Sequence, residues 1–151
     1  MRNGRRRNMR WDKELEYKLR ELPLRVKALE NLEDRISYLE ETKYMVKPVN
    51  TDSVPACGGI TKGEDVLVNK LVEIEELKKN LKSAEKEIAW LKQGLEVLND
   101  MEKDVINKMC FDKIQIKKIC EELGYEKSQI YRIKDQAIYK MTIALYGIIY
   151  S

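Results

Sequence analysis

The chain has 151 residues, a formal net charge of +3, 36% charged residues and only 7% aromatic residues. This is more charge and fewer aromatics than a compact enzyme core usually has. Histidine is absent and none of the three cysteines lies in a Cys-x-x-Cys pair. These absences argue against His-based zinc sites and against Ser/His/Asp or Cys/His nucleophiles. We therefore predict a protein that is not an enzyme, with no cofactor and no metal site.

The cysteines and the hydropathy pattern bear on location. Few, unpaired cysteines are typical of a reducing cytosol, and we expect Cys110 and Cys120 to be small core residues. No apolar run reaches the roughly 18 residues of a membrane span, and no apolar segment of the signal-peptide type follows the basic N-terminus. The sequence predicts a cytoplasmic protein without a membrane partner.

Residues 1–10 form a basic arm with five arginines and no acid. Such an arm is either a solvated tail or a segment that follows DNA phosphates or the minor groove. In the second interpretation Arg5, Arg6 and Arg7 contact phosphates. Both interpretations stay open from the sequence.

Residues 11–45 are an N-terminal helical region in which leucines recur at spacings of three and four, as in a heptad pattern. Pro23 interrupts this pattern and predicts a kink or a break, because proline lacks the N–H that a helix interior needs. Residues 46–63 hold two prolines and three glycines and are predicted to be a linker.

Residues 64–98 read as one long coiled-coil helix. Its apolar residues keep the heptad spacing from Leu67 to Leu98, with a single phase slip between Ile74 and Leu77. Such a stripe has to be buried against another helix. The partner is the first helix, in an intrachain hairpin, another copy of the chain, or both. We expect a homodimer through the coiled coil, with parallel or antiparallel pairing left open.

Residues 99–151 carry the pattern of a helix-turn-helix. Asn99 and Glu102 have the spacing of a capping box, which starts a short helix at Asp100. A second short helix ends at Gly124, where a left-handed residue is expected, and a third begins after a tight turn. The small Cys120 lies four residues before the glycine and Ile130 six residues after it, as the helix-turn-helix pattern requires.

The third helix is predicted to read DNA bases in the major groove. The face of this helix opposite its apolar stripe points outward. Recognition helices use the first turns of that face to reach base edges. Lysines on the preceding helix, or at the margin of the apolar face, reach only phosphates. The predicted base-reading residues are Lys127, Ser128, Gln129, Tyr131, Arg132 and Asp135. The predicted phosphate contacts are Lys117, Lys118 and Lys134, together with Arg5, Arg6 and Arg7 of the arm.

The segment LNDMEKDVINKMCFDKIQIKKICEELGYEKSQIYRIKDQAIYKM is similar to region 4 of the sigma-70 factors, which binds promoter DNA. More closely, the chain resembles the phage-encoded, sigma-like late-gene activators of the RinA/ArpU type. The segment SVPACGGITKGEDVLVNKLVEIEEL resembles their Pro/Gly-rich linker and charged helix, so the resemblance covers roughly residues 50–147. It implies an N-terminal coiled-coil region followed by a sigma-type helix-turn-helix. Glu126 departs from the pattern, because a Ser or Thr cap is usual there; the departure predicts a weaker cap and places an acid near the DNA phosphates.

Together these features predict an all-α protein, with long helices in a coiled coil or hairpin before a C-terminal, sigma-region-4-like helix-turn-helix. The predicted function is a sequence-specific transcription regulator encoded by a phage or prophage. It would act on double-stranded DNA in the cytoplasm of a bacterial host, with host RNA polymerase as a further partner. The alternatives are a DNA-packaging component similar to a small terminase subunit, and a coiled-coil adaptor that binds no DNA. The C-terminal position of the motif favours the regulator.

Overall fold

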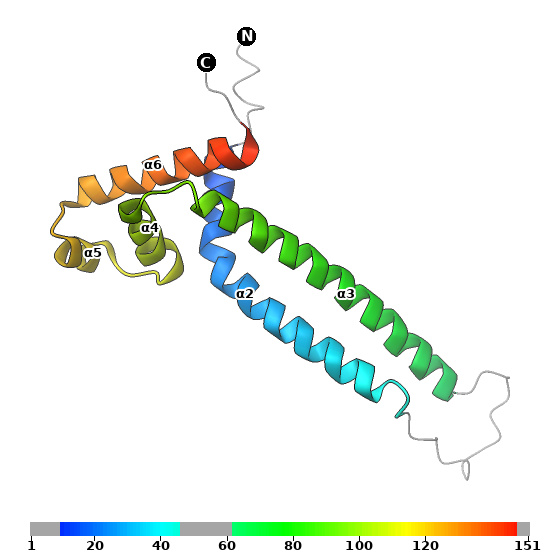
Figure 1. Cartoon of the computed structure of the whole chain (residues 1–151). Coiled ribbons are helices and arrows are strands. Elements are labelled where there is room, and N and C mark those ends of the chain that lie inside the picture. The colour runs from blue at the N-terminus through cyan, green and yellow to red at the C-terminus, as the bar shows by residue number, and fades with distance from the viewer. Residues whose placement is uncertain (1–9, 46–61, 148–151) are drawn as a thin grey trace. The chain divides into compact units, whose positions relative to one another are not determined.

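The computed structural model describes residues 10–45 and 62–147, and every regular element in these two ranges is helical (Figure 1). This confirms the predicted all-α class. The predicted arm with Arg5, Arg6 and Arg7 and the linker residues 46–61 lie outside the described residues. The elements in chain order are α2 (Trp11–Thr42), α3 (Lys62–Leu95), α4 (Asp100–Ile106), the π-helical turn η1 (Asn107–Phe111), α5 (Ile116–Leu123) and α6 (Lys127–Tyr146).

Helix α2 is continuous through Pro23, so of the kink or break predicted at this residue the break does not occur. A proline in a helix interior costs about 3 kcal/mol, whereas burying one leucine side chain gains about 1.5–3 kcal/mol. Leu15 and Leu19, in the turns before the proline, are fully buried. Pro23 itself is exposed, whereas the carbonyl that loses its donor belongs to the fully buried Leu19. Packing of the flanking leucines offsets the local cost.

The chain divides into two compact units. Unit 1 comprises the chain up to Arg25 and from Glu87 onward, and unit 2 is Val26–Lys86. The first unit therefore takes in more than the predicted DNA-binding segment 99–151, because it includes the start of α2 and the end of α3.

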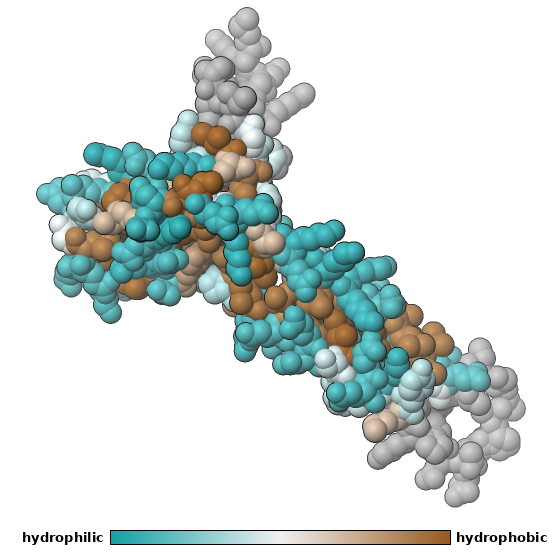
Figure 2. Space-filling model, in the orientation of Figure 1, coloured by the Kyte–Doolittle hydropathy of each residue, from teal (hydrophilic) through white to brown (hydrophobic). Residues whose placement is uncertain are grey.

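Unit 2 is an antiparallel hairpin of α2 and α3 (Figure 1). Arg35 pairs with Glu73 at 3.1 Å, whereas Thr42, farther along α2, receives a hydrogen bond from Lys70, earlier on α3. Residue numbers thus rise on one helix as they fall on the other. Apolar side chains form a band between the two helices, with hydrophilic side chains outside it (Figure 2). The intrachain hairpin, one of the arrangements left open by the sequence, is present in this chain. Its buried apolar residues are Ile36, Leu39 and Ile74.

Unit 1 packs α4, α5 and α6 with the first turns of α2 and the end of α3. Val105, Ile119 and Ile130 form a buried cluster among α4, α5 and α6. Helix α3 approaches α6 closely at Gly94, where an added Cβ would lie 2.6 Å from Leu145 Cδ1. The Tyr146 ring contacts both tryptophans: it lies tilted against Trp11, with ring centroids 4.6 Å apart, and edge-to-face with Trp90, with ring centroids 5.1 Å apart. The apolar residues buried elsewhere in this unit include Leu15, Leu19, Leu91 and Met141.

Helix α4 begins at the predicted capping box. Asn99 Oδ1 accepts a hydrogen bond from the Glu102 N–H at 2.8 Å, and Glu102 Oε1 accepts one from the Asn99 N–H at 3.0 Å. The two bonds satisfy donors that a helix start leaves unpaired. Among the described helices, none is both long and apolar enough to cross a membrane.

Candidate nucleic-acid interface

Helices α5 and α6 are joined by a three-residue turn that starts at Gly124. This glycine has φ +70° and ψ 23°, the left-handed conformation predicted from the sequence, and its N–H donates to the Cys120 carbonyl at 2.9 Å. No Cβ is present to oppose that conformation. The turn lets Ile119 of α5 and Ile130 of α6 meet in one buried cluster.

The start of α6 is held by Glu126 and Gln129. The Glu126 N–H donates to Gln129 Oε1 at 2.9 Å, so the glutamine covers one of the donors at the helix entrance. The resemblance led us to expect a weak cap here, because Glu126 replaces the usual Ser or Thr. Gln129 supplies an acceptor from within the helix instead. It was predicted to be a base-reading residue, and its amide oxygen is now engaged in this local bond.

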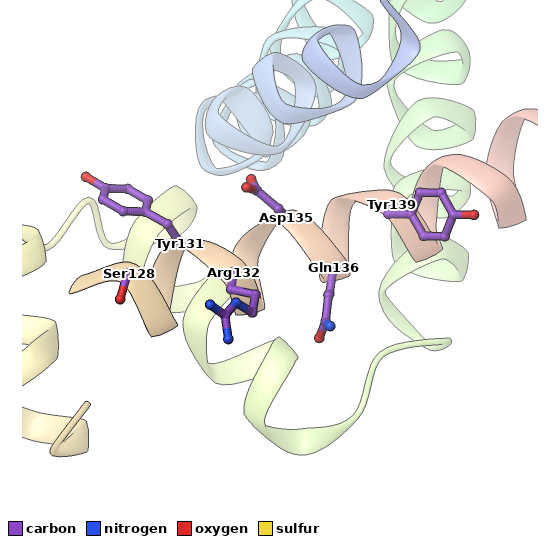
Figure 3. A pocket seen from close by; sticks show the side chains of 6 residues that line it. All are labelled: Ser128, Tyr131, Arg132, Asp135, Gln136 and Tyr139. Carbon is purple, nitrogen blue, oxygen red and sulfur yellow. The ribbon is translucent and has the colours of Figure 1, made fainter. Parts of the chain in front are cut away.

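The outward face of α6 presents a row of polar and aromatic side chains. They line a shallow hollow of about 540 Å³. In Figure 3, Ser128, Arg132 and Gln136 point to one side of the helix, whereas Tyr131 and Asp135 point to the other. Each set repeats every four residues, which places its members on one ridge of a helix. The residues that line the hollow are Ser128, Tyr131, Arg132, Asp135, Gln136 and Tyr139.

Most of the predicted base-reading residues lie together on this face. Four of them line the hollow, and Lys127 lies beside it with Glu126, Ser128 and Tyr131. The prediction missed Gln136 and Tyr139, although each lies four residues after a predicted residue on the same ridge. Arg132 is exposed and forms no hydrogen bond or ion pair with the residues that the structure describes. Its guanidinium can therefore bind an external acceptor without breaking an internal contact.

Lys134 has a different environment from the one predicted. Its ammonium group pairs with Glu16 Oε1 of α2 at 3.0 Å, and its side chain is only 14% exposed. Burial raises the pKa of Glu16, but hydrogen bonds from Lys134 and Arg20 outweigh it and hold the pKa below its ordinary value. A phosphate would have to compete with this carboxylate for Lys134. By contrast, Lys117 and Lys118 of α5 are exposed.

A second ion pair, not visible in the sequence, fixes α6 to α4. Lys140 Nζ lies 2.8 Å from Glu102 Oε1, and the Glu102 side chain is 3% exposed. The same carboxylate thus caps α4 and binds α6. Behind these helices Cys110 is fully buried, and this burial raises the pKa of its thiol to about 11.

Within the described ranges, no three Asp, Glu or Cys side chains come together as metal ligands. The feature that sets α6 apart is an uncovered helix face with arginine, amide, hydroxyl and carboxylate groups.

The chain is thus an all-helical protein with an exposed polar helix face after a tight turn. It belongs to the family described as "Protein of unknown function (DUF1492)", whose model matches residues 45–142. That match covers α3 to most of α6, and the N-terminal helix α2 lies outside it. Neither the curated proteins nor the solved structures contain a significant match to the chain.

Proposed function

We propose that the protein is a sequence-specific DNA-binding transcription regulator, in which α5 and α6 act as a helix-turn-helix. The observation that carries this proposal is the uncovered face of α6, where Ser128, Tyr131, Arg132 and Asp135 project from the first turns after Gly124. The major groove of B-DNA is about 12 Å wide and admits one α-helix. The exposed turns of α6 are the part of unit 1 that would enter it.

The groups on this face suit base edges. Arg132 would bind O6 and N7 of a guanine with two hydrogen bonds, the commonest specific contact in such interfaces. Asp135 would accept from the amino group of a cytosine, and Tyr131 and Ser128 would contact bases or phosphates. Lys117 and Lys118, one helix earlier, would bind phosphates and orient the protein on the duplex.

The similarity to sigma-70 region 4 and to the RinA/ArpU-type activators supports a more particular role. We propose that the protein regulates phage or prophage genes and contacts host RNA polymerase. The homodimer also stays a proposal. Because Ile36, Leu39 and Ile74 are already buried within one chain, a dimer through the same seam would exchange α2 or α3 between copies rather than add a helix.

Selection from a random duplex library with the full-length chain tests the proposal. We expect enrichment of one sequence. Arg132→Ala should then lose about 1–3 kcal/mol of binding free energy on that sequence. In a set of single-base variants of that sequence, Arg132→Ala should relax the base preference at one or two base pairs only. Arg35→Ala, which removes an exposed arginine from unit 2, is the control and should bind as the unsubstituted chain does. Absence of duplex binding at low salt would contradict the proposal.

A further inference from the structure

A cluster of charges joins α2 to the exposed part of α6. Glu16 Oε1 accepts from Lys134 Nζ at 3.0 Å and from Arg20 Nη2 at 3.1 Å. Because both cations bind the same oxygen atom, the Arg20 guanidinium lies close to Lys134, no farther than the sum of these two distances. Arg20 therefore lies beside α6, although it is more than 100 residues away in sequence.

The cluster continues onto the proposed DNA-reading face. Lys134 and Lys127 both lie near the Tyr131 ring, with their ammonium groups 5.6 Å and 5.9 Å from its centre. Tyr131 in turn lines the hollow on α6. Arg20 is thus connected through Glu16, Lys134 and Tyr131 to the surface that would meet DNA.

Exposure decides which of these cations can reach a phosphate. The Lys134 side chain is 14% exposed, whereas that of Arg20 is 50% exposed. Arg20 and Lys134 share the Glu16 carboxylate, and the second acid of the cluster, Asp135, lies 3.9 Å from Lys134. The acids are thus concentrated on the less exposed of the two cations. The planar guanidinium carries five N–H donors, and a single bond from Nη2 to Glu16 leaves others for a second oxyanion.

We propose that Arg20 of α2 binds a DNA phosphate beside α6, so that the DNA-binding surface extends from the helix-turn-helix onto the N-terminal helix. Lys134 then has a supporting role: its ammonium group pairs with Glu16 and weakens the repulsion between that carboxylate and the phosphate. This inference rests on the proposed DNA-binding function. It assigns a DNA contact to a helix that lies outside the matched family range.

The test is the salt dependence of duplex binding by the full-length chain. Fluorescence anisotropy would be measured with a labelled mixed-sequence duplex of about 30 base pairs at several salt concentrations. Each phosphate contact contributes about 0.9 to the slope of log affinity against log salt. Arg20→Gln should lower that slope by about 0.9 and weaken binding of all sequences about equally. Arg25→Gln is the matched control, because Arg25 makes the same kind of i,i+4 pair on the same helix, with Glu21 at 3.3 Å. It should keep the original slope.

A second substitution separates phosphate binding from an effect on folding. Glu16→Gln removes the carboxylate between Arg20 and Lys134, so it should strengthen binding and raise the slope; a lower slope would overturn the proposal. Equal slopes for Arg20→Gln and Arg25→Gln would overturn the Arg20 assignment alone. Failure of the unsubstituted chain to bind any duplex would overturn the proposed function, and the Arg20 assignment with it.

Discussion

Replacing Glu102 or Lys140 should loosen the attachment of α6 to α4 by a measurable amount. Glu102 is 2% exposed and accepts hydrogen bonds from the Asn99 N–H and from Lys140. Glu102→Gln keeps an acceptor for Asn99 but loses the charge opposite Lys140. Hydrogen bonds to charged groups are worth about 1.5–3 kcal/mol, and Lys140 is about half exposed, which weakens the pair. We expect a loss of about 1–2 kcal/mol in the free energy of unfolding.

Lys140→Ala should cost somewhat more, about 2–3 kcal/mol, because it leaves a buried carboxylate with a single donor. The two tryptophans, Trp11 and Trp90, both lie in unit 1, so their fluorescence in a urea titration reports on the unit that contains this pair. The double variant completes a thermodynamic cycle. We expect a coupling energy of about 1 kcal/mol, and a coupling near zero would refute the idea that this ion pair holds α6 in place.

Acid should reproduce part of this loss. Burial raises the pKa of Glu102, but hydrogen bonds from the Asn99 backbone and from Lys140 outweigh it, so the pKa lies below its ordinary value of 4.5. A carboxyl whose pKa is lowered on folding stabilises the protein above its unfolded-state pKa. That contribution is lost as the pH falls through the folded-state pKa. The difference in stability between Glu102→Gln and the original chain should therefore be full at neutral pH and should shrink below about pH 4.

Three further predictions address the helix pair and the core. Lys118→Ala should weaken binding of all duplexes about equally and lower the slope of log affinity against log salt by about 0.9, measured by anisotropy. A change in sequence preference would show that the proposed position of α5 on DNA is wrong. Gly124→Ala should destabilise unit 1 by about 1–2 kcal/mol in urea titrations, because an L residue is strained at φ +70°. Gly124→Asn should recover part of that loss, and equal stability of all three chains would contradict the assigned turn. Since burial raises the pKa of Cys110 to about 11, iodoacetamide at pH 8 should leave this thiol unmodified until the chain unfolds. Peptide mass spectrometry would measure this, and rapid labelling of the folded chain would contradict the burial.

The features that the sequence predicted correctly are local ones. The capping box joins Asn99 to a residue three positions on, and the left-handed Gly124 bonds to Cys120, four positions back. Both signals lie within one turn of a helix, where spacing alone determines which groups can meet. Helical periodicity likewise placed Ile119 and Ile130 in the core, because a side chain's face on a helix follows from its number.

The contacts that the sequence missed join residues distant in the chain. Lys134 was correctly placed at the margin of the apolar face of α6, but periodicity cannot tell that Glu16 covers it. The same holds for Lys140, whose partner Glu102 was recognised only as a cap. Gln129 is a different case, since it lies three residues after Glu126 and the capping-box spacing could have revealed its bond. The π-helical turn at Asn107–Phe111 has no signal in the sequence that we can name.

The division of unit 1 into two stretches of sequence has a consequence for how the protein is made. During translation the buried Leu15 and Leu19 have to wait for Leu91 and Met141, which emerge much later. The hairpin Val26–Lys86 needs no later residue, so we expect it to form first. The antiparallel pairing of this hairpin brings Val26 and Lys86 together. A shorter effective loop then separates the two stretches of sequence that form unit 1. A chain released before Met141 would then carry a finished hairpin and an unfinished unit 1.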